Sequence, residues 1–346
     1  MFKYSRRAFL KGLAAGACLL NAGRRAAAQT SLRLSLPPLQ DVLPLGFAHN
    51  EGLFEAAGLA VELIGVSSHR ERSSALLSNN LDGVVSDVST LLFERGNAEA
   101  DIVITSTAFD IIDDTRQVAL LASGFFNVSD LDALFKRIND RAANKITVSR
   151  RTDFELITDE LLTSLGIALD PDLYYTDTDD LINAATLLVG GSVLSAVLPE
   201  PLAALTEQNE LIEEQFLSKA VSDFKNIPMP PSVVVFRREV IEDRQAEVEL
   251  FYQVYRQAVE EINAASKDAV RETAILNTLE LFLPGLSRSE LPQDFGNDYK
   301  IPAFPQPRAL LEGEFNRVLA WTRQKGYLQG QVDFNASVDF RFIPAA

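Results

Sequence analysis

The sequence predicts an α/β fold with mainly parallel sheets flanked by helices. Short β-rich runs alternate with helical patterns through most of the chain, which is typical of βαβ units. The chain has 346 residues, of which 47% are hydrophobic and 23% charged, as in ordinary globular proteins. This length is sufficient for two domains or two lobes.

Eight β-rich runs are expected to form strands. Each has 5 to 7 residues, and turn or helix signals flank it. The runs are residues 31–36, 60–66, 83–88, 101–107, 117–123, 145–149, 192–198 and 232–236.

Helical patterns occupy the intervals between several of these runs and dominate the chain after residue 238. The patterns at 69–80 and 152–166 are examples, and Gly166 suits a left-handed C-terminal cap. A proline cluster, "IPMPPS" (227–232), is expected to be a crossover or hinge. The later helical stretch carries one apolar stripe, expected to face the core: Val248, Phe251, Tyr255, Val259 and Ile262.

Residues 1–28 have the features of an export signal. Arg6 and Arg7 precede a short apolar run, which is much shorter than the ~20 residues of a membrane-spanning helix. The stretch "SRRAFLKG" resembles the twin-arginine export motif, and Ala28 ends a small-residue cleavage pattern. An ordinary signal that happens to contain two arginines is the alternative. We expect a mature chain that begins at Gln29 in the periplasm.

Cys18 is the only cysteine of the sequence and lies inside this signal. The mature chain is therefore expected to have no disulfide, no thiolate nucleophile and no cysteine metal ligand. A lipid anchor at Cys18 is not expected, because Ala15 stands where lipoprotein signals usually have leucine.

The chain is strongly acidic. Its formal net charge is −16, and the segment 1–28 contributes only cations, so its removal makes the remaining chain more negative. Such a surface repels nucleic acid and anionic lipid. We therefore expect no nucleic-acid partner.

Several segments resemble one family of exported binding proteins. The stretch 44–92 contains "EGLF" (51–54), "AGL" (57–59), "LDG" (81–83) and "SD" (86–87) in the family's order. Downstream matches are "ITVSRRTDFE" (146–155), "VLSAVLPEPLAAL" (193–205), and "WTRQKGYL" (321–328) with "VDFNASVDFRFIP" (332–344). Together they resemble the periplasmic solute-binding proteins of ABC importers for nitrate, sulfonates, taurine and thiamine precursors.

The resemblance implies a two-lobed type II periplasmic-binding fold with the ligand in the cleft between the lobes. The first lobe would comprise residues 29–122 and 232–346, and the second would comprise 123–231. The implied partners are a small-molecule ligand and an ABC permease with its ATPase, and the protein is expected to be a monomer. Closure of the lobes on the ligand would prepare it for delivery to the permease.

Ligand contacts are expected just after strands, because ligands of open α/β sheets bind outside the carboxyl ends of the strands. Helix starts and arginines at these positions favour a small organic anion such as a sulfonate or carboxylate, ahead of a heteroaromatic pyrimidine precursor and then nitrate. Ser67 and Thr152 could equally be simple N-caps. Asp87 and Glu200 instead suit a cationic group, and an amphoteric ligand would satisfy both sets. The predicted ligand-binding residues are Gln40, Asp41, Ser67, Ser68, His69, Arg70, Ser86, Asp87, Ser149, Arg150, Thr152 and Glu200.

Two other classes of function are alternatives to transport. A thiamine-pyrimidine synthase shares this type of fold, but its family uses a cysteine-rich iron motif that the mature chain lacks. His49 and His69 are the only histidines, and no phosphate-binding glycine loop is present. We therefore expect no catalysis, no cofactor and no metal. A binding module that serves a sensor stays open as an alternative.

Overall fold

The computed structural model describes residues 31–140, 144–168, 170–208, 216–264, 273, 277–278, 280–282 and 301–344. The predicted signal at 1–28 and Cys18 lie outside the described residues. Among the described helices, none combines the length and the apolar character that a membrane crossing requires.

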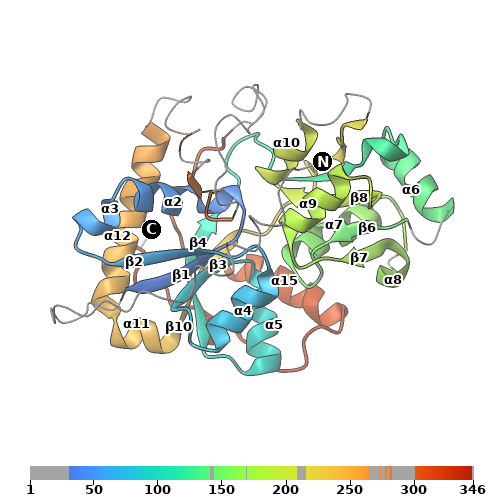
Figure 1. The fold of residues 1–346 in the computed structure, drawn as a ribbon. Coiled ribbons are helices and arrows are strands. Elements are labelled where there is room, and N and C mark those ends of the chain that lie inside the picture. The colour runs from blue at the N-terminus through green and yellow to red at the C-terminus, as the bar shows by residue number, and fades with distance from the viewer. Residues whose placement is uncertain are drawn as a thin grey trace. The chain divides into compact units, whose positions relative to one another are not determined.

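The first sheet has five strands in the order β2-β1-β3-β10-β4 (Figure 1). β1 pairs in parallel with both β2 and β3, whereas β10 pairs antiparallel with β3 and β4. Their bounds are β1 Leu32–Leu36, β2 Val61–Gly65, β3 Gly83–Ser86, β4 Ile102–Phe109 and β10 Ser232–Arg237.

The second sheet also has five strands, in the order β7-β6-β8-β5-β9. β6 pairs in parallel with β7 and β8, whereas β5 pairs antiparallel with β8 and β9. Their bounds are β5 Val118–Ala122, β6 Ile146–Val148, β7 Tyr175–Asp177, β8 Ser195–Pro199 and β9 Lys219–Ser222.

The α/β class is confirmed, and each predicted run overlaps one of these strands. In each described sheet one strand, β10 or β5, runs against the other four. Both follow a passage of the chain from the other sheet, β4 to β5 and β9 to β10, so no crossover helix dictates a parallel direction. The predicted boundary after residue 122 would leave β5 with the first sheet, but β5 pairs within the second.

Helices cover both faces of the first sheet (Figure 1). Alternate residues of its strands enter two hydrophobic clusters; Val103 and Val234 belong to one, and Ile104 and Val235 to the other. The first cluster is covered by α2 (Leu43–Asn50), α3 (Leu53–Ala56), α11 (Arg238–Asp243) and α12 (Gln245–Ala264), and the second by α4 (His69–Leu77), α5 (Val88–Ala98) and α15 (Glu312–Gln324).

The apolar stripe predicted after residue 238 is confirmed, because all five of its residues are buried on α12. This helical stretch is divided at Arg244, which separates α11 from α12. The Arg244 guanidinium reaches the Asp82 carboxylate at 3.1 Å. This ion pair ties the helix junction to the loop before β3.

The second sheet is covered in the same two-sided manner. Apolar residues of α9 and α10 pack with Ala119, Leu121 and Leu198, whereas those of α6 and α7 pack with Leu120 and neighbouring residues. α15 contacts both α5 and α7, so one helix joins elements of the two sheets. The remaining bounds are α6 Leu131–Asp140, α7 Asp153–Ser164, α8 Pro171–Tyr174, α9 Leu181–Val189, α10 Leu202–Glu207, α16 Phe334–Ser337, and the short 3-10 helices η1 Gln40–Val42 and η2 Gly124–Phe126.

Candidate functional site

A cavity of about 40 Å³ lies where loops from the two sheets meet. The loops follow the carboxyl ends of β1, β2, β3, β6, β7 and β8, or precede the reversed strands β5 and β10. A space of this size holds a few water molecules. The lining residues are Pro37, Leu39, Asp41, Ser67, His69, Arg72, Ser86, Asp87, Gln117, Ser149, Thr152, Asp153, Phe154, Asp179, Leu181, Pro199, Met229, Pro230 and Ser232.

Most of the predicted ligand-binding residues line this cavity. Thr152 also caps α7, because its Oγ1 accepts a hydrogen bond from Phe154 N at 3.2 Å. Ser67 is not a cap; Ser68 caps α4 instead. The seven predicted residues that the structure brings together are Asp41, Ser67, His69, Ser86, Asp87, Ser149 and Thr152.

Five predicted residues lie outside the lining, and each has protein partners. Gln40 is buried and donates from Nε2 to the Arg116 carbonyl at 3.4 Å. Glu200 is buried in an ion pair with Arg116 at 2.5 Å, so its carboxylate already has a cationic partner. Ser68 donates from Oγ to Asp179 Oδ2 at 3.0 Å.

The two predicted arginines also lie outside the lining. Arg70 pairs with Asp177 and lines a separate, open hollow of about 480 Å³. Arg150 lies beside Glu155 at 3.6 Å and donates to the Tyr327 hydroxyl at 3.1 Å. Long side chains can reach acidic neighbours on either side of a helix start, and sequence spacing does not say which.

Contacts between the loops of the two sheets close the cavity. Ser149 Oγ and His69 Nδ1 are 3.2 Å apart, and His69 N donates to the Asp179 carbonyl at 3.2 Å. The Arg151 guanidinium lies 5.3 Å from the centre of the Phe93 ring. Residues from both sheets therefore meet directly around this space.

Asp153, which was not among the predicted residues, forms hydrogen bonds between the loops of the two sheets. Its carboxyl group accepts from Val88 N at 3.4 Å and Ser89 N at 3.2 Å, and the Ser89 hydroxyl also donates to it. The Asp87 carboxylate caps the same helix by accepting from Thr90 N at 2.7 Å. Protein carboxyl groups therefore occupy the N-terminus of α5.

Burial shifts the pKa values of these carboxyl groups upward. Loss of solvent, followed by the nearby charge of Asp87, raises the pKa of Asp153 to about 8. Loss of solvent also raises the pKa of Asp87, against the hydrogen bonds from Thr90 and the charge of Arg72. For Asp41, burial raises the pKa to about 6. These three carboxyl groups therefore hold their protons at a higher pH than carboxyl groups in water do.

Of the basic side chains of the lining, Arg72 is buried and His69 is partly buried. Desolvation, with the charges of Arg72 and Arg70, lowers the pKa of His69 to about 4, so the imidazole is neutral at pH 7. Desolvation lowers the pKa of Arg72 to about 10, and its guanidinium remains charged. Arg72 donates to the Val66 carbonyl at 2.5 Å and the Ser67 carbonyl at 3.3 Å.

Other missed lining residues follow short or irregular segments. Asp179 comes after β7, whose three residues the sequence analysis did not identify as a strand. Met229, Pro230 and Ser232 belong to the proline cluster that was interpreted only as a crossover or hinge. Recognition of β7 would have drawn attention to the acidic stretch "DTDD" (177–180) as a strand end.

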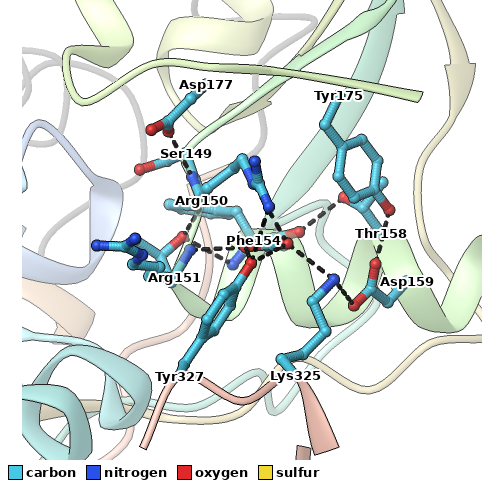
Figure 2. Close-up of polar contacts among 12 residues, drawn as sticks. Ser149, Arg150, Arg151, Phe154, Thr158, Asp159, Tyr175, Asp177, Lys325 and Tyr327 are labelled. Carbon is cyan, nitrogen blue, oxygen red and sulfur yellow. Dashed lines mark hydrogen bonds and ion pairs between the residues drawn. The ribbon is translucent and has the colours of Figure 1, made fainter. Parts of the chain in front are cut away.

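A second polar cluster lies beside the cavity, on the first two turns of α7. Lys325 reaches Glu155 and Asp159 at 2.9 Å each, and Figure 2 shows it pointing toward Asp159. Asp159 also accepts from the Tyr175 hydroxyl and Trp321 Nε1, both at 2.8 Å. We call Glu155, Asp159, Tyr175, Trp321, Lys325 and Tyr327 the α7 network.

The lining of the cavity presents groups that can bind a ligand. His69 contacts the Ser149 hydroxyl, but no acidic side chain of the described residues hydrogen-bonds to its ring. Among the described residues, no group of three or more histidine, cysteine or acidic side chains has the arrangement to hold a metal ion. What the lining offers is hydroxyl groups, carboxyl groups and apolar walls from Leu39, Phe154 and Met229.

Solved structures with the same fold come from several bacteria. The ligand-binding component of an ABC-type import system from Staphylococcus aureus has a TM-score of 0.68 at 14% identity, covering 91% of this chain and 98% of that one. The alkanesulfonate-binding protein SsuA from Xanthomonas axonopodis pv. citri, bound to MOPS, has the same TM-score and identity over 91% and 100%. The periplasmic nitrate-binding protein NrtA from Synechocystis PCC 6803 has a TM-score of 0.66 at 13% identity over 89% and 85%.

At these identities the likeness establishes the fold, which is that of periplasmic binding proteins. No curated protein is significantly similar to the chain. The model of one family, described as the NMT1-like family, matches residues 25–277, well over half of the chain. The chain therefore belongs to the NMT1-like family.

Proposed function

We propose that the chain is the substrate-binding component of an ABC importer, which captures a small organic solute and delivers it to a permease. The observation that carries the proposal is the cavity itself, which lies at strand ends of two separate α/β sheets and is closed by direct contacts between them. The names of the structural neighbours, which are binding components of import systems or sulfonate- and nitrate-binding proteins, support the same role.

The mechanism follows from contacts that exist only when the two sets of loops meet. A ligand that touches Asp41 and Ser86 on one side and Ser149 and Thr152 on the other is bound fully only in the closed arrangement. Its differential affinity then shifts the population toward that arrangement. The closed protein is the form that we expect the permease to recognise.

The proposal includes two lobes, with a boundary moved from the one predicted by the sequence. β5 pairs with β8 and β9, so we place the first crossing between β4 and β5, in residues 110–117, and the return crossing before β10. The seven predicted residues that line the cavity are proposed as ligand contacts, together with Asp153 and Asp179.

The proposal also covers location and assembly. Residues 1–28 would direct the chain through the twin-arginine route to the periplasm, where it would act as a monomer and without catalysis. The arginine pair Arg6-Arg7 carries the export part of this proposal.

Uptake by whole cells tests the import role. Cells that lack the gene should lose uptake of a labelled solute that the purified chain binds, and the intact gene should restore it. A gene with Arg6→Lys and Arg7→Lys together should fail to restore uptake, because the folded chain would stay in the cytoplasm. Unchanged uptake in the deletion strain would contradict the import role.

A further inference from the structure

We propose that the ligand of this cavity carries a protonated nitrogen, such as an ammonium, amidinium or guanidinium group, and is not a simple anion. The inference rests on the proposed binding function and specifies its substrate class. It departs from the sulfonate or carboxylate favoured by the sequence, and it retains an amphoteric ligand only if the ligand's cationic end enters this cavity.

The first argument is the charge of the lining. Four carboxyl groups line the cavity, from Asp41, Asp87, Asp153 and Asp179. Arg72 is the one described lining residue that carries a positive charge at pH 7, because His69 is neutral there. Since the Arg72 guanidinium donates to two backbone carbonyls and lies near Asp87, it is already engaged within the protein.

The second argument is the isolation of Asp41. Its side chain is 95% buried and lines the cavity, yet no ion pair joins it to another described residue. The nearby Ser232 hydroxyl, also buried, lowers the pKa of Asp41 in part but makes no hydrogen bond of ordinary length among the described residues. A buried carboxylate without a cation is costly, and a ligand cation at this position would relieve the cost.

The third argument is that the protein fills its own anion positions. At the start of α5, Val88 N and Ser89 N donate to Asp153, and Thr90 N donates to Asp87. At the start of α7, Phe154 N donates to Thr152. Backbone N–H groups at helix starts are the donors that an anion would need. An anionic ligand would have to displace these groups and approach several carboxylates.

The lining also indicates what accompanies the cationic group. Leu39, Phe154, Leu181 and Met229 add apolar side chains to the lining beside its carboxyl groups. A short aliphatic or small planar body suits these side chains. The ligand class is therefore a small organic amine or a related nitrogen base.

A bound cation should also change protonation. The groups that face Asp153 across the cavity are Asp87 at the start of α5, Arg72 and His69 on α4, Asp41 on η1 and Asp179 after β7. A cation stabilises the ionised carboxylates, so Asp153 and Asp41 release protons when it binds. Affinity should consequently rise between pH 6 and pH 8, the interval that their two pKa values span.

Titration calorimetry with probes of matched size tests the inference on the full-length chain. Methylammonium, propylammonium and guanidinium are compared with propionate and propanesulfonate. At least one of the three cations should bind saturably and about tenfold or more tightly than either anion, a difference of about 1.4 kcal/mol. Tighter binding of an anion, or no binding of any of the cations in the millimolar range, would overturn the proposal.

Two variants and one control connect the binding to the cavity. Asp41→Asn should weaken binding of the best cation about tenfold or more, and Asp179→Asn provides a second test if the first variant does not fold. Glu62→Gln removes a negative charge from an exposed position of β2 and should bind like the wild type. Wild-type affinity in folded Asp41→Asn or Asp179→Asn would overturn the assignment.

The outcomes separate ligand class from transport role. A cation that binds in calorimetry but whose uptake does not depend on the gene would defeat the import role and leave the ligand class standing. Gene-dependent uptake of an anion that also binds the purified chain would support the import role and defeat the proposed ligand class.

Discussion

Two groups of buried carboxylates lie close together in this chain and differ in one respect, their partners. In the α7 network, Glu155 and Asp159 share Lys325 at 2.9 Å. Tyrosine and tryptophan donors complete their hydrogen bonds. Figure 2 shows Lys325 and Tyr175 on either side of Asp159. In the cavity, Asp41 has no cationic partner among the described residues. Asp153 accepts hydrogen bonds from backbone N–H groups and lies near the charge of Asp87.

The comparison shows that burial and ion pairing together distinguish carboxylates with a structural role from carboxylates that can bind a ligand. A buried carboxylate with a cation and several donors is satisfied within the protein, so its role is to hold elements together. Here the network joins α7 to Lys325 and Tyr327, which follow α15. A buried carboxylate that faces a cavity without a cation is instead available to a ligand. We expect the two groups to respond in opposite ways to neutral substitutions.

The largest expected effect comes from removal of the shared cation. Lys325→Met leaves Glu155 and Asp159 buried without their ammonium partner, so the free energy of unfolding should fall by about 3–5 kcal/mol. Urea denaturation measures this change. Arg341→Met, which breaks a more exposed pair with Asp339, is the matched control and should cost about 1 kcal/mol or less. Equal losses in the two variants would contradict a special role for Lys325.

Hydrogen bonds to the network should be stronger than hydrogen bonds to neutral groups. Tyr175→Phe removes a donor to the Asp159 carboxylate and should cost about 2 kcal/mol. Tyr255→Phe removes a donor of equal length, 2.8 Å, to the Ala108 carbonyl and should cost about 1 kcal/mol. Both phenols are buried, so the pair compares acceptors at similar burial. Urea denaturation measures both losses of unfolding free energy. A larger loss for Tyr255→Phe than for Tyr175→Phe would contradict the stronger hydrogen bond to the Asp159 carboxylate.

A smaller effect is expected in the pH dependence of stability. The pKa of Asp153 is raised from 3.8 to about 8 on folding, so the folded chain binds more protons than the unfolded chain between these values. The free energy of unfolding contributed by this group therefore falls as pH rises from about 4 to about 8. Asp153→Asn should flatten this fall and stabilise the ligand-free chain at pH 8.

Thermal or urea unfolding at several pH values checks that prediction. Asp130→Asn serves as the control, because Asp130 is exposed and its pKa is lowered by hydrogen bonds from Ala133 and Ser129. Its substitution should not flatten the fall between pH 4 and pH 8. If Asp153→Asn leaves the wild-type slope unchanged, the raised pKa is not a property of the folded cavity.

The sequence predicted most of the fold because buried strands have strong local signals. All eight expected runs overlap strands, and seven of the twelve expected contacts line the cavity. β7 and β9 were missed because both are short edge strands with polar or exposed residues, such as Thr176 and Lys219. Edge strands have less buried surface, so their sequences need not alternate.

The sequence did not predict which partner each polar residue would take. Local spacing placed Thr152 at a helix start and Asp87 just after a strand, where the structure also has them. It could not show that Asp153 docks on a helix 64 residues earlier, because that contact depends on how the two sheets are brought together. The preference for an anion arose from helix starts that also carry arginines. In the structure Arg70 pairs with Asp177, and Arg150 lies beside Glu155.

The most direct test of this account compares Asp41→Asn with Asp159→Asn. For each variant, the free energy of unfolding at pH 7.5 and the affinity for the best cation would be measured. The account predicts that Asp41→Asn keeps or gains stability, because burial raises the pKa of Asp41 to about 6, and loses cation binding. Asp159→Asn should lose stability and retain cation binding. Loss of stability with unchanged binding in Asp41→Asn would contradict the account.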